Sequence, residues 1–322
     1  MDFSARMCPV PRANLFTETD YFVWCGAMFK FREAYYLIYS RWEKALGFEA
    51  WVTDSRVCLA KADSMFGKFT HLRELFDYRG QTPEERKVIH NPTVLIHQGR
   101  IYLYYMTNYG TGDWWQHRNR QRIGVAYTDD PEGEWTMPEE PVLDISPVGI
   151  DSLLVSNPSV VEKPDGKILM IYKAVSNEGV MPKGGSVICG AAEADSPLGP
   201  FRKYGKPLFV NPENPWSVED PYVWYENGRY YALAKDFQGY FTGTGEMSTA
   251  LFTSENGLDW EPDPEHPLAY ENVLHLEDSD RRVRFLERPQ LYFESGKPAV
   301  LLCACMMRQG DDTTYNIRIP LR

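Results

Sequence analysis

The sequence predicts an all-β fold, a five-bladed β-propeller with four-stranded antiparallel blades around a central channel. Two observations support this prediction. A segment made of a strand, a glycine turn and a second strand recurs along the whole chain, and a shorter segment ending in an aromatic residue follows most copies. Repeats of this length are typical of units that bury a shared core only by stacking on their neighbours, as propeller blades do.

The longer repeat begins with an X-Pro pair in four copies: NPTVLIHQGRIYLYYM, NPSVVEKPDGKILMIY, DPYVWYENGRYYALA and RPQLYFESGKPAVLL. Their prolines, Pro92, Pro158, Pro221 and Pro289, are separated by 66, 63 and 68 residues. A degenerate first copy, CGAMFKFREAYYLIYS, places Gly26 another 66 residues earlier. We therefore expect one domain over residues 1–322, with blades at about 21–80, 88–145, 153–210, 217–270 and 284–322.

The shorter repeat supplies the third and fourth strands of a blade. LAKADSMFGKF, VAYTDDPEGEW, GAAEADSPLGPF and LFTSENGLDW each form a strand, a polar turn and an aromatic that opens the next strand. The last copy of the long repeat ends at NIRIPLR without this segment. We expect a strand from the residues before Cys25 to complete the fifth blade and close the ring, since closure removes an exposed sheet edge.

The second strands of the hairpins are apolar on both alternating faces, as in the segment 101–106, IYLYYM. A sheet in a two-layer sandwich leaves one face wetter, whereas a blade is packed between two neighbours. This pattern favours the propeller. Two long segments interrupt the compact spacing, 107–122 and 176–186, and are either binding loops or surface excursions packed by their own aromatic residues.

Composition excludes several classes of partner. The net charge of −11 and a pI near 5.1 oppose binding to nucleic acid. No stretch resembles a signal peptide or a membrane span, so the chain as written is expected to be cytoplasmic, or periplasmic or secreted if it is a mature form. The six cysteines show no paired spacing and are expected to be buried apolar residues, with no metal ligands and no cofactor.

The residues just before each repeat proline are the first candidates for a functional site, because the first strand of every blade lines the channel. Acidic residues occur there only in the fourth and fifth blades, as Glu219, Asp220 and Glu287. Hydrolysis of a glycosidic bond needs one carboxylic acid as proton donor and usually a second carboxylate as base or nucleophile. Taken singly, Asp220 could instead form a turn and Glu287 a salt bridge. The other residues at these positions are Trp24, Cys25, His90, Asn91, Ser156, Asn157 and Arg288.

A second set of candidates follows the second strand of three hairpins. Lysine or arginine side chains there could hold sugar hydroxyls, neutralise the acids or bind an anionic substrate, although ion pairs at the rim would explain them equally well. Tryptophans could stack on a sugar or simply pack between blades. This set consists of Arg41, Trp42, Lys173, Lys235 and Asp236.

The sequence resembles the five-bladed propeller glycoside hydrolases of families 43, 32 and 117 through HNPTV, SNPSV, KAVSN, VEDPYVWY, KDF and LERPQL. The resemblance implies that an Asp before a first-strand proline and a Glu two residues before one are catalytic, which Asp220 and Glu287 match. Families 32 and 43 also place an Asp in the first blade, where this chain has Cys25. The base is therefore unassigned, with Glu219, Asp236 and Asp20 as substitutes in that order. Calcium lies in the channel of some relatives.

These observations predict an exo-acting glycosidase of plant or microbial polysaccharide fragments, including substrates with a furanosyl or a uronic-acid unit. Glu287 would be the proton donor, Asp220 would orient it or tune its pKa, and Glu219 or Asp236 would be the base. Substrate contacts are expected from Trp24, Arg41, Trp42, His90, Asn91, Asn157, Lys173, Lys235 and Arg288. A non-catalytic carbohydrate-binding propeller and a phosphorylase that uses Arg41, Lys173 and Lys235 to hold phosphate are the alternatives. The pattern specifies neither the sugar nor an oligomeric state.

Overall fold

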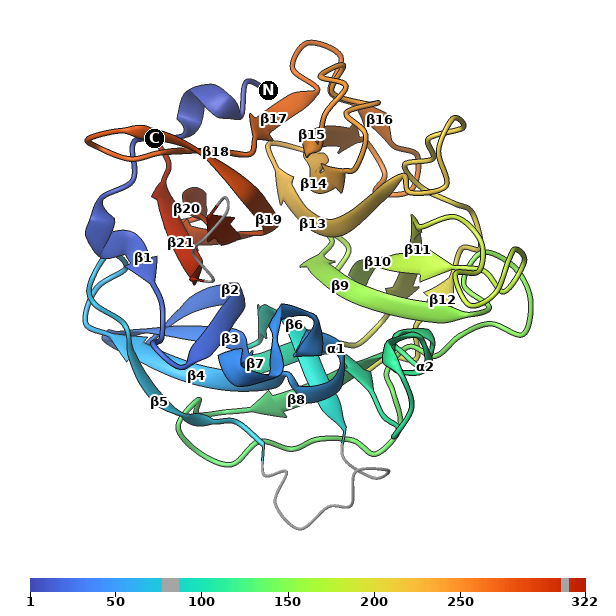
Figure 1. Ribbon diagram of the computed structural model, residues 1–322, viewed down its shortest axis with the longest axis horizontal. Coiled ribbons are helices and arrows are strands. Elements are labelled where there is room, and N and C mark those ends of the chain that lie inside the picture. The colour runs from blue at the N-terminus through green and yellow to red at the C-terminus, as the bar shows by residue number, and fades with distance from the viewer. Residues whose placement is uncertain (77–86, 308–312) are drawn as a thin grey trace.

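A computed structural model describes residues 1–76, 87–307 and 313–322 and consists of five antiparallel sheets arranged as blades around one axis (Figure 1). The predicted five-bladed propeller is confirmed. Blade 1 contains β2 (Tyr21–Phe31), β3 (Ala34–Glu43), β4 (Arg56–Ala62) and β5 (Thr70–Glu74). Blade 2 contains β6 (Val88–His97), β7 (Arg100–Asn108) and β8 (Arg122–Thr128), and blade 3 contains β9 (Leu154–Glu162), β10 (Ile168–Val175), β11 (Ile188–Ala194) and β12 (Arg202–Lys203).

Blades 4 and 5 follow the same order with additions at their edges. Blade 4 contains β13 (Val218–Glu226), β14 (Arg229–Asp236), β15 (Ser248–Ser254) and β16 (Glu261–Pro262), and β17 (Leu268–Glu271) also pairs with β15. Blade 5 contains β19 (Asp280–Glu294), β20 (Lys297–Met307) and β21 (Thr314–Pro320), with β18 (Val273–His275) beside β19. Two short helices, α1 (Trp51–Asp54) and α2 (Trp114–Asn119), lie after the hairpins of blades 1 and 2.

The N-terminal segment closes the ring as predicted. Strand β1 (Leu15–Phe16) pairs with β21 in antiparallel register, with Leu15 opposite Ile317 and Phe16 opposite Asn316. Figure 1 shows this blue segment beside the red strands of blade 5. The C-terminal blade is thereby completed by the beginning of the chain, and β1 covers part of the edge that β21 would otherwise expose.

Blade 2 departs from the expected four strands. Its outer segment reaches β8 through two isolated bridges. Thr136 and Tyr127 exchange two backbone hydrogen bonds, of 3.0 and 2.9 Å, and Leu143 and Ile123 exchange two of 3.2 Å. Pro138 follows two residues after Thr136 and has no N–H to continue the ladder. The fourth strand of this blade is therefore reduced to two isolated bridged pairs.

The hairpin turns follow from the glycines of the repeat. Three of them have positive φ at both central residues, in the pairs Gln98–Gly99, Asn227–Gly228 and Ser295–Gly296. Two consecutive positive φ values define the type I′ turn, whose twist matches that of the two strands it joins. In these three blades the repeated glycine thus allows the first strand to return directly along its blade.

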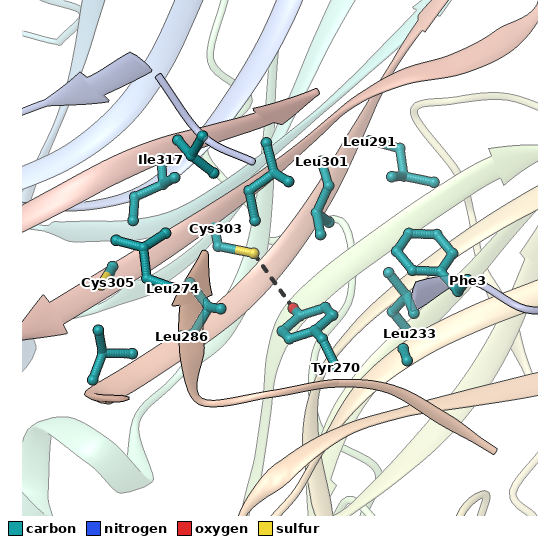
Figure 2. Packing of buried hydrophobic residues seen from close by; sticks show 14 of the residues in the cluster. Phe3, Leu233, Tyr270, Leu274, Leu286, Leu291, Leu301, Cys303, Cys305 and Ile317 are labelled. Carbon is teal, nitrogen blue, oxygen red and sulfur yellow. Dashed lines mark hydrogen bonds between the residues drawn. The ribbon is translucent and has the colours of Figure 1, made fainter. Parts of the chain in front are cut away.

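Five separate hydrophobic clusters fill the five interfaces between neighbouring blades. Figure 2 shows the cluster between blades 4 and 5, in which Leu233 of β14 and Leu301 of β20 lie on either side of Tyr270. The Tyr270 hydroxyl lies 3.4 Å from the Cys303 sulfur, and Phe3 packs at the edge of the same cluster. The N-terminal residues therefore contribute to the core as well as to the sheet.

The six cysteines are free thiols, and five of them are buried, whereas Cys8 is partly exposed. Cys303 and Cys305 lie in the cluster between blades 4 and 5 as small apolar residues, as expected from their place in an apolar strand. In the part of the chain that the structure describes, no helix has the length and apolar character needed to span a bilayer.

Candidate active site

A bulge in the first strand of every blade creates the site. The residue before each repeat proline, or before Gly26, has left-handed backbone geometry: φ is 48° at Cys25, 54° at Asn91, 49° at Asn157, 58° at Asp220 and 57° at Arg288. The strand register shifts at these points. Such bulges change the direction of a side chain, and Asn and Asp tolerate positive φ better than most residues.

The five bulged residues form a chain of contacts across the hub of the propeller. Cys25 Sγ donates to Asn91 Oδ1 at 2.7 Å, Asn91 Nδ2 donates to Asn157 Oδ1 at 2.6 Å, and Asn157 Nδ2 donates to Asp220 Oδ1 at 2.7 Å. Arg288 Nη1 donates to the same Asp220 oxygen at 3.2 Å. Each blade thus contributes one side chain, and these contacts hold Asp220 in place between Asn157 and Arg288.

The hub is a poor match for a calcium ion. Calcium prefers six to eight oxygen ligands, mostly carboxylates and carbonyls. Here the Asn91 and Asn157 oxygens already accept hydrogen bonds from neighbouring hub residues, and Arg288 adds a positive charge beside the Asp220 carboxylate. Among the described residues no group of three or more His, Cys, Asp or Glu side chains is arranged to hold a metal.

Two glutamates and two lysines form a buried network in the pocket at the hub. Lys173 Nζ lies 2.7 Å from Glu219 Oε2, and Lys235 Nζ lies 2.7 Å from both Glu219 Oε1 and Glu287 Oε2. The register of the blades explains this convergence, because Lys235 is the ladder partner of Glu219 and Lys173 is that of Ser156. Lys235 links the two glutamates, which come from neighbouring blades.

The pKa values of the two glutamates are shifted in opposite directions within this network. Burial raises the pKa of Glu287 to about 7, and the negative charges of Asp220 and Glu219 act in the same direction, against the lowering effect of Lys235. Burial also disfavours ionised Glu219, but Lys173 and Lys235 outweigh it and hold the pKa of Glu219 below its ordinary value. At neutral pH Glu219 is therefore an ionised carboxylate, while Glu287 is poised to carry a proton.

The other titratable side chains at the hub are either uncharged or paired with an opposite charge. Burial, followed by the charge of Glu219, raises the pKa of Asp220, although Arg288 opposes this shift. Burial raises the pKa of the Cys25 thiol well above its ordinary value and lowers that of His90 well below its own, so both side chains are uncharged. A neutral thiol at the first-blade position cannot act there as the base that the family resemblance implies.

The structure brings most of the sequence-predicted site residues into one pocket of about 210 Å³. Glu219, Asp220 and Glu287 line it at the hub. His90 hydrogen-bonds Ser55 Oγ at 2.7 Å and stacks on Trp51, with ring centroids 5.1 Å apart. The predicted contact residues that line this pocket are Trp24, Trp42, His90, Asn91, Asn157, Lys173, Lys235 and Arg288.

Two predicted site residues, Arg41 and Asp236, lie outside this pocket. Each is one residue beyond the ladder position that faces the hub, since Ser40 pairs with Trp24 and Lys235 pairs with Glu219. Because side chains alternate along a strand, this single step turns them to the other face. Arg41 forms ion pairs of 2.7 Å with Glu18 and 3.3 Å with Glu74, which places it in a network at the N-terminal segment.

Asp236 organises the loop after β14 instead of facing the hub. Its Oδ2 accepts hydrogen bonds from the backbone N–H groups of Phe241 at 2.8 Å and Thr242 at 3.2 Å. The side chain is completely buried. Asp236 thus has structural partners in the loop and lies outside the pocket, which makes Glu219 the better placed candidate for the missing base.

Sequence reasoning missed the residues that loops bring to the pocket. Trp51 comes from α1, Trp114 and Arg118 from α2, and Trp216 from the segment before β13. The only sequence signal is the cluster of aromatic residues in the long 107–122 segment, part of which lines the pocket. The other unpredicted lining residues are Phe48, Glu49, Gln121 and Phe285.

Comparison with known proteins agrees with this arrangement. A family model described as "Glycosyl hydrolases family 43" matches residues 27–259. The chain belongs to this family. It is a glycoside hydrolase with a propeller fold, and the matched region includes Glu219 and Asp220 but ends before Glu287. A search of curated protein sequences found no match.

Solved structures resemble the whole chain at low identity. The crystal structure of a thermostable family-43 glycoside hydrolase has a TM-score of 0.65 and 13% identity, covering 98% of this chain and 96% of the other. Zg3597, a family 117 glycoside hydrolase of Zobellia galactanivorans, has a TM-score of 0.61 and 17% identity, covering 97% and 89%. The family GH43_1 enzyme of Xanthomonas citri, complexed with xylotriose, has a TM-score of 0.59 and 14% identity, covering 99% and 92%. The resemblance to families 43 and 117 is thus confirmed at the level of fold.

Proposed function

We propose that this glycoside hydrolase removes a terminal sugar unit from oligosaccharides derived from plant or microbial polysaccharides, using Glu287 as the acid and Glu219 as the second carboxylate. The observation that carries the proposal is the pairing of a carboxyl that holds a proton near neutrality with an ionised one in the same pocket. The xylotriose complex of the Xanthomonas citri enzyme supports an oligosaccharide as the class of substrate.

The shape of the pocket supports action at a chain end. Its volume of about 210 Å³ is below the roughly 300–1,000 Å³ of pockets that enclose drug-sized ligands. The hub residues Asn91, Asn157, Asp220 and Arg288 form its floor, and the tryptophans supply broad apolar faces suited to a sugar ring. A pocket of this size fits one sugar unit, while the remainder of the substrate would extend toward solvent.

The distance between the carboxylates favours a retaining mechanism. Because Lys235 Nζ lies 2.7 Å from an oxygen of each, the two oxygens are separated by no more than twice that length. Carboxyl groups about 5–5.5 Å apart are typical of retaining glycosidases, whereas inverting enzymes keep them about 6.5–9.5 Å apart to admit a water. Glu219 would therefore act as a nucleophile.

The proposed reaction has two steps. Glu219 attacks the anomeric carbon while Glu287 gives its proton to the glycosidic oxygen, so the leaving alcohol departs and a glycosyl ester forms on Glu219. Glu287, now ionised, then removes a proton from water, which attacks the same carbon and releases the sugar and the Glu219 carboxylate. Lys173 and Lys235 keep Glu219 ionised at the start of each cycle, and Asp220 contributes to the raised pKa of Glu287.

A screen of pectin- and hemicellulose-derived oligosaccharides, followed by NMR of the first anomer released, tests the proposal. We expect one terminal sugar to be released with retained configuration. Glu219→Ala should lose turnover and regain it with azide, giving a glycosyl azide of inverted configuration, while Glu226→Ala at the far end of the same strand should behave as wild type. An inverted product, or full activity of Glu219→Ala, would contradict the mechanism.

The same screen separates the alternatives. A carbohydrate-binding propeller, which the neutral Cys25 at the first-blade position would suit, binds oligosaccharides and returns them intact. A phosphorylase requires inorganic phosphate and releases a sugar phosphate. Of the three bases considered for holding phosphate, Lys173 and Lys235 are already paired with Glu219, and Arg41 lies outside the pocket.

A further inference from the structure

Arg118 is placed at the pocket by a helix that is itself firmly anchored. The Asp113 carboxylate accepts a hydrogen bond from the Gln116 N–H at 2.9 Å and caps α2. Asn108 contacts His117 Nδ1 at 2.7 Å and donates to the Val52 carbonyl at 3.0 Å, which joins α2 to α1. The helix therefore has a fixed position relative to the hub, and so does the side chain that follows His117.

The guanidinium of Arg118 is buried, and only one of its nitrogens is used for structure. Nη1 donates to the Lys183 carbonyl at 2.8 Å and to Asn119 Oδ1 at 2.9 Å, and the residue is only 3% exposed. Its other two nitrogens donate to no residue within the described ranges. Since the side chain lines the pocket, these donors are available to a ligand there.

Arg118 also differs from the other pocket cations in its charge balance. Lys173 and Lys235 are paired with Glu219, and Arg288 is paired with Asp220. Within residues 1–76, 87–307 and 313–322, no carboxylate lies within ion-pair distance of Arg118. The guanidinium carbon lies 5.7 Å from the centroid of the Trp115 ring, and such a contact balances a buried charge less fully than a carboxylate does, so a ligand that brings a negative charge to this position would be stabilised.

The charge of Arg118 persists under ordinary conditions. Burial lowers its pKa to about 10, with Glu219 acting in the opposite direction, so the guanidinium is protonated at neutral pH. Glu49 is the remaining acidic residue of the lining, and its side chain is exposed to solvent. Water screens an exposed carboxylate far more than a buried cation, so the interior of the pocket near Arg118 favours an anion.

We propose that Arg118 binds the carboxylate of a uronic acid, so that the terminal sugar in the pocket is anionic. The guanidinium offers parallel donors that match the two oxygens of a carboxylate. Trp114 and Trp51 line the same pocket and meet edge to face with ring centroids 5.9 Å apart, giving apolar surface for the sugar ring next to the cation. The inference rests on the proposed function and adds a substrate class to it.

Isothermal titration with monosaccharides tests the proposal. Glucuronic, galacturonic and mannuronic acid are compared with glucose, galactose and mannose, and each uronic acid also with its methyl ester, which keeps the ring but lacks the charge. We expect at least one uronic acid to bind about tenfold or more tightly than its neutral parent and its ester, as a charge-assisted hydrogen bond implies. Arg118→Gln should abolish this preference, whereas Arg120→Gln at the end of the same helix should retain it.

The binding experiment tests the role of Arg118 independently of the hydrolase mechanism. Equal binding of acids, esters and neutral sugars by the wild type overturns it, even if Arg118→Gln does not fold. Inorganic phosphate that binds through Arg118 while no uronic acid is preferred also overturns it, and points to a phosphate site. Uronic-acid preference without any cleavage of oligosaccharides supports Arg118 as the anion ligand but removes the catalytic roles of Glu219 and Glu287.

Discussion

Replacing Glu287 by Gln should change activity and stability in opposite directions, and both changes should depend on pH. The proposed mechanism requires protonated Glu287, so the kcat/KM of the wild-type enzyme should fall above the pKa of about 7 and be roughly a hundredfold lower two pH units higher. Glu287→Gln cannot donate a proton, and its kcat/KM should be about 10²–10⁴-fold lower with no alkaline limb at this pKa.

The stability effect follows from the same titration. The pKa of Glu287 is raised from 4.5 to about 7 in the folded protein, so the folded state binds the proton more tightly than the unfolded chain. Folding stability due to this group is therefore fully present below about pH 4.5 and is lost as the pH rises through 7. The shift corresponds to about 3 kcal/mol. Since Gln does not titrate, the unfolding free energy of Glu287→Gln relative to wild type should increase by up to about 3 kcal/mol between pH 4 and pH 8.

Urea unfolding at several pH values and a pH profile of kcat/KM measure the two effects on one pair of proteins. Glu294→Gln, at the last residue of β19, is the matched control. It keeps an acceptor for the Tyr292 hydroxyl and should leave the pH dependence of both profiles as in the wild type. An unchanged alkaline limb in Glu287→Gln, or a stability difference that does not vary with pH, would refute the assignment of Glu287 as the buried acid.

Three further substitutions test the hub, the ring closure and the role of Asp236. Asn157→Gly and Asn157→Ala both lose the hydrogen bonds at the hub, but Ala also has to adopt a φ of 49°, so it should be less stable than Gly by about 1 kcal/mol in urea unfolding; equal stability would contradict a strained bulge. Arg318 donates to the carbonyls of Ala13, Met65 and Gly67, so Arg318→Ala should lower the unfolding free energy by about 3 kcal/mol or more, whereas exposed Arg32→Ala should change it by less than about 0.5 kcal/mol. Asp236→Ala should lower the melting temperature through loss of its hydrogen bonds from the loop and leave the alkaline limb of activity in place, while a displaced limb would return Asp236 to the catalytic site.

The sequence predicted the architecture because every blade repeats the same local geometry. The X-Pro pairs mark the bulges of the first strands, and glycines such as Gly99 mark turns that require positive φ. The convergence of Glu219 and Glu287 followed from their equivalent places in neighbouring repeats. Lys173 and Lys235 also have equivalent places in neighbouring repeats, so the sequence alone predicted that they lie on the same rim.

The sequence did not predict the positions of side chains correctly where the repeat leaves the register of the strands undetermined. Arg41 was aligned with Lys173 and Lys235, but the strand ladder places Ser40 at that position, and a step of one residue reverses the face. Arg118 and Trp114 lie in a loop that has no counterpart in the other blades. Their distance from the hub depends on the helix cap and on contacts with α1, which spacing along the chain does not encode.

The bulged side chains at the hub affect how the enzyme would degrade a long polysaccharide. The opposite face of the propeller has a separate cavity of about 360 Å³ lined by Met28, Val94 and Leu291, and among the described residues it shares no lining residue with the catalytic pocket. Because hydrogen-bonded side chains from all five blades cross the hub, the proposed exo action would release its monosaccharide through the opening by which the substrate entered. The shortened polymer has to dissociate first, so degradation of a long chain should be distributive, with every molecule in the population trimmed by one unit before any is trimmed repeatedly.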